Sequence, residues 1–305
     1  MKTITGNTVR KPYSKLGKAV ENYGQAVEAV GFSINALPIP SPTNPGQNIR
    51  NKTGLFRSDN GECLEIHSEK FAFVQPSDSL MVLEKAREIV GAKWESIQVN
   101  KGGRMVCGFV AVENEFIVPK RGDVISFGLG HKDFFDGKGL EEFFLYSNNL
   151  SCTNGMVSSK AVMSFKNKHI GDIGDRVKAI EGRLQYQFVL AVNEMKEKIT
   201  TLDSKPMDLR QVEGFAERLF PSELVGDELP TRTENMRKAI VTGFSRGTGN
   251  QGRTAWDAFN SVTEFLDWGS TFRETEFSRD ENRFESLLMG KAMGTRERAL
   301  ELLLN

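Results

Sequence analysis

Cysteine is scarce in this chain, with three residues among 305, Cys63, Cys107 and Cys152. They lie far apart and form no C-x-x-C pair. Disulfide frameworks and cysteine-rich zinc sites need paired cysteines, so the sequence excludes both and indicates a reducing compartment.

Histidine is equally rare, and His67, His131 and His169 are the only ones. None of them belongs to a pattern such as H-E-x-x-H, in which two imidazoles share one face of a helix. We therefore expect no metal site and no cofactor.

Net charge and long apolar runs are also absent. The 40 Lys and Arg residues equal the 40 Asp and Glu residues in number, so no global field draws the chain to nucleic acid or to an anionic membrane. Any anion site must be a local patch. No segment has the apolar length of a membrane span or the pattern of a signal peptide, which predicts a cytoplasmic protein without membrane contact.

Residues 1–48 are expected to form a basic N-terminal arm, a short helix near 21–30 and a proline-rich strap. Five cations precede the first acid, Glu21: Lys2, Arg10, Lys11, Lys15 and Lys18. A solvated tail and a nucleic-acid-binding arm both fit them. Four prolines between residues 36 and 48 predict a strap without regular structure.

Residues 49–205 are predicted to form an α+β core domain. Alternating apolar residues indicate an antiparallel β-meander, with hairpin turns at 101–103 and 136–139 and an inserted helix after Pro76. From Ile170 to Leu202 apolar residues recur every three or four positions, which predicts one long amphipathic helix. Such a helix braces the sheet or packs between subunits.

Residues 206–305 are predicted to be a helical C-terminal region packed on the core. Helical patterns cover 207–219, 233–244, a segment from Ala255 and 279–304. The fold class is thus α+β: an antiparallel β-meander with an inserted helix, braced by a long amphipathic helix and a helical C-terminal region.

The segment 247–254 matches two phosphate-site patterns, G-x-G-x-x-G and a P-loop with Arg253 in the place of lysine. Both patterns need a parallel sheet around them, and too little chain follows to supply one. We interpret the match as coincidental. Thr254 instead reads as a helix N-cap with Asp257 in a capping box.

The helix that follows this loop is expected to have two unlike sides. The buried stripe consists of Trp256, Phe259, either Val262 or Thr263, and Leu266. The polar ridge consists of Asn260, Glu264 and Asp267. The ridge lies beside a positively polarised helix start and could hold a phosphate or a partner carboxylate. A plain solvated face explains it as well.

Catalysis has one weak candidate, a pair formed by Cys152 and His169. A turn after a β-strand, with Asn154 supplying conformational freedom, explains the same residues at least as well. We predict that the protein is not an enzyme.

Local cations point to a positively charged groove that tracks a phosphate backbone. The candidate contacts are Lys101, Arg104, Lys120, Arg121, Lys166, Lys168, His169, Arg176 and Arg253. Nearby aromatic residues could offer stacking faces for bases: Phe134, Phe135, Phe143, Phe144 and Tyr146. Charged turns beside a phenylalanine-rich core would give the same pattern, so both interpretations stay open.

Several short motifs in fixed order resemble a known family. They include the segment 54–64, Cys152-Thr153-Asn154, Thr254 with Trp256, and Asn260 with Glu264. Together they resemble a phage- and plasmid-borne family that is catalogued as a domain of unknown function. The resemblance implies a bacterial host cytoplasm and a setting of replication and recombination, but no catalytic residues. The expected architecture also looks like that of phage single-strand annealing proteins.

These observations predict a phage-encoded, oligomeric protein that binds or anneals single-stranded DNA without chemistry. The alternative is a self-assembling accessory protein, or one that binds phage replication or host proteins, and does not bind nucleic acid. In that case the stripe of Ile173, Val177, Ile180 and Leu184 would form the protein interface.

Overall fold

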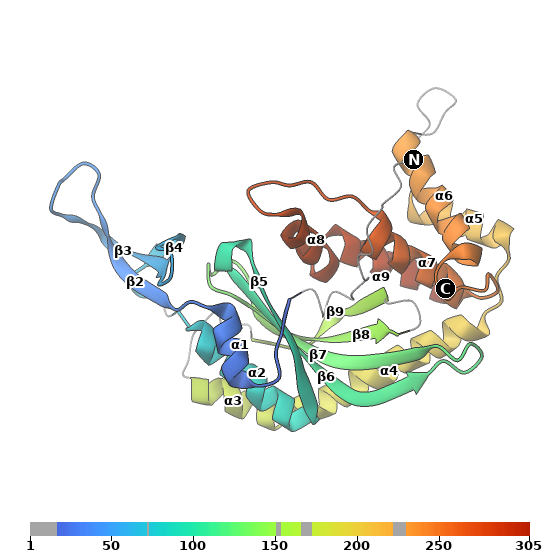
Figure 1. Ribbon diagram of the computed structural model, residues 1–305, viewed down its shortest axis with the longest axis horizontal. Coiled ribbons are helices and arrows are strands. Elements are labelled where there is room, and N and C mark those ends of the chain that lie inside the picture. The colour runs from blue at the N-terminus through green and yellow to red at the C-terminus, as the bar shows by residue number, and fades with distance from the viewer. Residues whose placement is uncertain (1–16, 72, 151–153, 166–172, 222–229) are drawn as a thin grey trace.

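The computed structural model describes residues 17–71, 73–150, 154–165, 173–221 and 230–305 (Figure 1). A six-stranded antiparallel sheet has the strand order β1-β5-β6-β7-β8-β9. Its strands are β1 (Lys18–Ala19), β5 (Ala92–Asn100), β6 (Met105–Ile117), β7 (Val124–Phe134), β8 (Glu141–Asn149) and β9 (Asn154–Phe165). Each strand from β5 onward pairs with its successor, so the predicted meander and the α+β class are confirmed.

The described helices follow the sequence pattern closely. Early in the chain they are α1 (Tyr23–Val30), α2 (Pro76–Val90), η2 (Lys101–Gly103), α3 (Ile173–Glu181) and α4 (Leu184–Ser204). The C-terminal region holds α5 (Leu209–Leu219), α6 (Thr231–Arg246), α7 (Ala255–Glu264), η3 (Phe265–Gly269), α8 (Arg279–Leu288) and α9 (Lys291–Leu304). The predicted helix 279–304 is therefore two helices, which separate at Met289 and Gly290.

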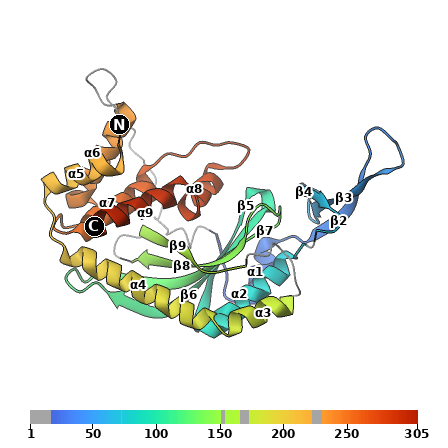
Figure 2. The ribbon, with the colours of Figure 1, turned by 180° about the vertical axis from the view of Figure 1, so that it is seen from behind.

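Helices cover both faces of the sheet (Figures 1 and 2). Gly108 on β6 faces Leu83 of α2, which lies on the same side of the sheet as α4. The next residue, Phe109, packs its ring edge-on against Phe284 of α8, with 6.1 Å between ring centroids. Because successive strand residues point to opposite faces, the sheet lies between an α2–α4 layer and a C-terminal helical layer.

The β5–β6 turn has the left-handed backbone that its Lys-Gly-Gly sequence favours. Lys101, Gly102 and Gly103 have φ angles of 55°, 63° and 94°, a left-handed backbone that glycine adopts without strain. The Lys-Gly-Gly sequence was predicted to be a hairpin turn, and this prediction is confirmed.

The long helix predicted for 170–202 is instead two helices within the described residues. Arg183, with φ −134° and ψ −32°, is not helical, and α3 and α4 separate at Gly182 and Arg183. Ile180 and Leu184 on either side of this break are fully buried. The stripe considered as a protein interface therefore belongs, at these two residues, to the core beneath the sheet.

The prediction that the proline-rich segment lacks regular structure is wrong for residues 36–40, whereas residues 41–47 form a loop. Residues 34–40 form a strand, β2 (Ile34–Pro40), which pairs with β3 (Asn48–Arg57), and β3 pairs with β4 (Cys63–Ser68) in a second sheet. Proline is tolerated because β2 is an edge strand, where the missing N–H would face solvent. The β2–β3 arm, residues 34–57, projects beyond the rest of the molecule (Figures 1 and 2).

Candidate functional site

The family-motif residues of α7 lie over the turn between β6 and β7. The Arg121 guanidinium pairs with the Asp257 carboxylate, and their side chains are 4% and 0% exposed. Arg121 also lies 3.5 Å from Asp123. A candidate nucleic-acid contact is thus neutralised inside the protein by two acids.

Asp123 connects this turn to two more family-motif segments. Its Oδ2 accepts hydrogen bonds from Trp256 Nε1 at 3.0 Å and from Asn149 Nδ2 at 3.3 Å. Asn149 pairs in register with Asn154, the first residue of β9. The side chains of Asp123, Trp256 and Asn149 are buried, and that of Asn154 lies outside the described side chains. The motif therefore forms a structural polar network.

The Asp257 carboxylate, which pairs with Arg121, also closes the glycine loop before α7. Asp257 accepts hydrogen bonds from the backbone N–H groups of Gln251, Arg253 and Thr254 at 2.9, 2.9 and 3.0 Å. These amides would face a phosphate in a P-loop, but here an internal carboxylate occupies that position. The geometry supports the interpretation of 247–254 as a coincidental match, and the predicted capping box is confirmed.

The polar ridge of Asn260, Glu264 and Asp267 is not the solvated face that the sequence suggested. Asn260 is 2% exposed and Asp267 is 5% exposed, and Asp267 pairs with the buried Arg296. Glu264 accepts hydrogen bonds from the Thr248 backbone and hydroxyl at 3.2 and 3.1 Å. The ridge ties α7 to its neighbours and does not form an anion site.

Arg104 also acts within the protein. Its guanidinium donates to the carbonyl oxygens of Leu64, Lys101 and Cys63, which fastens β4 to the end of β6. Lys101 forms an ion pair with Glu285 of α8 at 2.6 Å. Both cations hold layers of the fold together.

Arg176 lies in a buried charged chain on the α3 side of the sheet. Its Nη1 donates to Glu141 Oε2 at 2.6 Å, and Glu141 Oε1 lies 3.0 Å from His131 Nε2. All three side chains are at most 6% exposed. The prediction that Arg176 contacts a nucleic-acid backbone is not met in this fold, because the side chain is buried and pairs with Glu141.

Of the remaining predicted contacts, Lys120 and Arg253 are exposed. They lie at one corner, where Lys120 donates its backbone N–H to Asp203 at the end of α4 and Arg253 precedes α7. Lys166, Lys168, His169, Cys152 and Thr153 fall outside the described residues. Predictions that rest on them stay predictions.

The aromatic residues expected to stack with bases lie mainly in the core. Phe135, Phe143, Phe144 and Tyr146 are 1%, 0%, 4% and 1% exposed. Tyr146 also donates its hydroxyl to Glu95 at 2.6 Å. These rings support the sheet and offer no accessible stacking face.

An accessible surface of another composition covers one side of the small sheet. Leu37, Gly54 and Ile66 are direct partners across β2, β3 and β4, so they share a face. Lys52 and Phe56 lie two residues from Gly54 along β3 and point the same way. We name this surface the outer face and define it by Leu37, Lys52, Gly54, Phe56 and Ile66.

The outer face is apolar and partly aromatic. Leu37 and Ile66 are 50% and 45% exposed, and Phe56 is partly exposed. A Cβ built on Gly54 would lie 2.4 Å from the Phe56 ring and 2.4 Å from Ile39 Cδ1, so both side chains lie over the glycine. A small residue at the centre of the sheet thus positions an aromatic ring at the surface.

The charge around the outer face has one sign. No acid occurs from residue 29 to residue 58, and Arg50 and Lys52 are exposed on β3. The acids of the β4 region point elsewhere: Glu65 pairs with Lys138, and Glu69 lines a pocket on the opposite side together with Thr53 and Leu55. The arm is therefore a local positive feature on a neutral protein.

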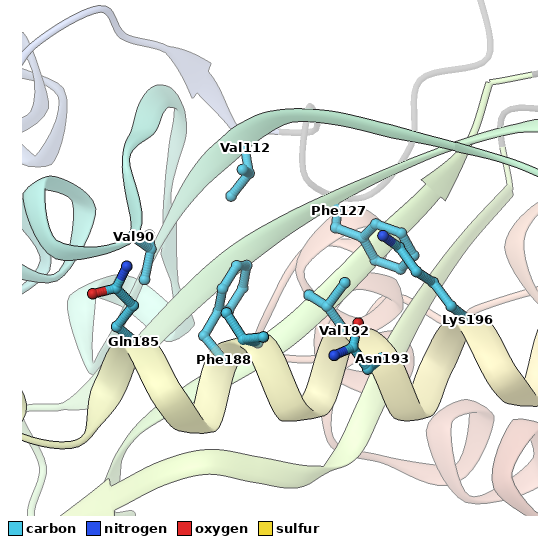
Figure 3. Close-up of a pocket in the computed structure, with 9 residues that line it drawn as sticks. Val90, Val112, Phe127, Gln185, Phe188, Val192, Asn193 and Lys196 are labelled. Atoms are coloured by element: carbon cyan, nitrogen blue, oxygen red, sulfur yellow. The ribbon is translucent and has the colours of Figure 1, made fainter.

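A separate apolar pocket of about 240 Å³ lies between α4 and the large sheet (Figure 3). Phe188 and Val192 of α4 face Val112 and Phe127 of the sheet across it. Lys196 extends over the Phe127 ring, with 5.7 Å between Nζ and the ring centroid. The lining is mainly apolar, and its polar side chains are Gln185, Asn193 and Lys196.

Redox and metal chemistry find little support in the described residues. Burial raises the pKa of the buried Cys107 thiol and also that of the half-buried Cys63 thiol. A raised pKa disfavours the reactive thiolate. Among the described residues no cluster of three potential metal ligands occurs. In the same part of the chain no helix is long and apolar enough to cross a membrane.

The fold and its polar network define an α+β protein in which a central antiparallel sheet lies between two helical layers. The chain belongs to the family described as Domain of unknown function (DUF932), whose family model matches residues 63–288. The matched span starts at β4 and ends with α8, so it includes the buried network and leaves out the β2–β3 arm. No curated protein and no solved structure matches the chain significantly.

Proposed function

We propose that this protein binds single-stranded DNA without chemistry, with the outer face and the β2–β3 arm as its contact surface. The observation that carries the proposal is the outer face itself, where the Phe56 ring and two exposed aliphatic side chains lie beside Lys52 with no acid among them. Sites for single strands combine cations that follow the phosphates with rings on which bases stack.

A single strand fits this surface better than a duplex does. Unpaired bases expose apolar faces that Phe56, Leu37 and Ile66 can cover, whereas a duplex hides those faces in its stack. Arg50 and Lys52, which both lie on β3, neutralise phosphates of the DNA. Burial of apolar surface and release of counterions then act together.

The neutral overall charge is compatible with this proposal. Screening limits the reach of exposed charges to about 8 Å at physiological ionic strength, so a ligand on the projecting arm experiences mainly its own cations. Lys120, Arg253, Lys166 and Lys168 remain proposed secondary contacts.

We propose further that the protein works in a bacterial cytoplasm, in the replication or annealing recombination of a phage or plasmid. The support is the motif resemblance, whereas the DUF932 match identifies a domain of unknown function and carries no phage or plasmid setting. The β2–β3 arm precedes the matched residues, whereas Ile66 of the outer face lies within them.

The test is binding of fluorescent single-stranded and duplex oligonucleotides, followed by anisotropy over a salt series. We expect the single strand to bind more tightly than the duplex. The variant Arg50→Ala/Lys52→Ala should lower affinity about tenfold or more, since each charge-assisted contact contributes roughly 1.5–3 kcal/mol.

A matched control is Arg210→Ala/Arg246→Ala, which removes two exposed cations from α5 and α6 at the opposite end of the molecule (Figure 1). It should bind like the wild type. Equal losses in both variants would indicate nonspecific attraction and contradict the proposed surface. No binding at low salt would contradict the function itself.

A further inference from the structure

Helix α4 presents an apolar stripe to solvent beside the face that it packs on the sheet. Tyr186, Val189 and Leu190 are 70%, 48% and 42% exposed. Their spacing of three and four residues places them on one side of the helix. Leu184, Phe188 and Met195 fill the buried side. The exposed stripe is thus additional to the face that α4 needs for its own fold.

The charges along this stripe are arranged symmetrically about Leu190. Arg183 precedes Leu190 by seven residues, 190 − 183 = 7, and Glu197 follows it by seven, 197 − 190 = 7. Seven residues are about two helical turns, so Leu190 and Glu197 lie on the same side of α4. Arg183 is the N-cap that precedes α4, and because its ψ of −32° is close to the helical value, its Cβ continues that side. Both charged residues are exposed, and neither forms an ion pair among the described residues.

We propose that this stripe is a self-association surface, on which α4 of a second copy of this chain packs antiparallel about a two-fold axis near Leu190. A two-fold contact requires a patch that complements itself. Here Arg183 of each copy meets Glu197 of the other. Tyr186 likewise meets Glu194, which lies four residues beyond Leu190. Leu190 meets its own counterpart in the centre, and Val189 meets Ala191 beside it.

The neighbouring pocket extends the apolar area of the contact. Val189 and Asn193 line the pocket shown in Figure 3 and also border the stripe. A partner helix along the stripe would therefore lie across the pocket mouth and remove further apolar surface from water. The stripe lies on α4, apart from the small sheet, so this inference does not depend on DNA binding.

The contact covers about four helical turns, which is small for a permanent dimer. We expect a reversible dimer whose population rises with protein concentration and falls with added salt. Sedimentation equilibrium of the full chain at several loading concentrations measures this directly.

Charge reversal gives the decisive test. Arg183→Glu places two acids opposite each other at both ends of the contact, and Glu197→Arg places two cations there. Each variant alone should raise the dimer dissociation constant by about tenfold or more. An equimolar mixture of the two variants should dimerise again, because every cross-contact then joins opposite charges.

The reversal Arg210→Glu on α5 is the matched control, since it changes an exposed cation outside the stripe, and it should leave the dissociation constant unchanged. Circular dichroism verifies that each variant is folded. A wild-type protein that stays monomeric at all concentrations would overturn the proposal. A mixture of the two reversed variants that does not associate would overturn it as well.

Discussion

Arg121 and Asp257 form a buried ion pair that joins the β6–β7 turn to the first turn of α7. The same carboxylate accepts three backbone hydrogen bonds from the glycine loop and from the start of the helix. One acid therefore neutralises a cation from the sheet and satisfies the amides that precede α7. This relationship explains how a segment resembling a phosphate loop can be filled without any ligand.

Replacing either Arg121 or Asp257 should therefore destabilise the folded protein strongly. Arg121→Ala and Asp257→Ala should each lower the free energy of unfolding by about 3–5 kcal/mol, because each removes the ion-pair partner of a buried charge. Urea unfolding of the single and double variants checks this. The double variant should cost less than the sum of the two, and strict additivity would show that the pair is not coupled.

Arg176 should behave as a structural residue. Arg176→Ala leaves Glu141 without its guanidinium partner, and we expect a loss of roughly 3–5 kcal/mol in unfolding free energy. The neighbouring Lys178 is exposed, and Lys178→Ala should change stability by about 0.5 kcal/mol or less. A stable Arg176→Ala variant with weakened DNA binding would show that this cation acts as a contact after all.

Glu84 makes stability depend on pH. Its carboxylate accepts two hydrogen bonds from Arg87 and one from Trp94, and chiefly the bonded Arg87 guanidinium holds the pKa of Glu84 below its ordinary value. Because the folded state binds this proton less readily than the unfolded state, the stabilisation is present above the ordinary glutamate pKa, about 4.3, and is lost as the pH falls through the lowered value.

Thermal melts from pH 7 to pH 3 should show this contribution as a difference between proteins. Glu84→Gln should be less stable than the wild type at neutral pH and should approach it at the acidic end. Parallel curves for the two proteins would contradict a role for Glu84 in the pH dependence.

Phe56 should contribute affinity for bases. Stacking of one base on an aromatic ring is worth about 1–3 kcal/mol, so Phe56→Leu should weaken single-strand binding by roughly tenfold while it retains an apolar side chain over Gly54. Ile66→Val is the matched conservative change on the same face and should have little effect. Fluorescence anisotropy with a fixed single strand measures both, and equal affinities for wild type and Phe56→Leu would exclude stacking at this ring.

Local sequence patterns predicted the turns, caps and most helices of the fold. They did not predict contacts between residues far apart in the sequence. The Lys-Gly-Gly turn and the cap formed by Thr254 and Asp257 are decided by a few adjacent residues, so the sequence was sufficient. The β2 strand was missed because tolerance of proline depends on its place at a sheet edge, a tertiary property.

The functional residues were harder to predict for the same reason. An arginine reads alike in sequence whether it meets solvent or an acid from another element, and only the fold brings Arg121 to Asp257 and Arg104 to the carbonyl groups of β4. The acid-free run before Asp59 was available as a signal for the arm. Its prolines led to the interpretation as a strap, so the exposed cations Arg50 and Lys52 were not among the predicted contacts.

The most direct test of single-strand binding at the arm is the salt dependence of that binding. For a single strand, log K falls with log salt concentration by about 0.7 for each phosphate neutralised. If Arg50 and Lys52 each neutralise one phosphate, the slope for Arg50→Ala/Lys52→Ala should be shallower than the wild-type slope by about 1.4. An unchanged slope in a folded variant would contradict the arm as the phosphate contact.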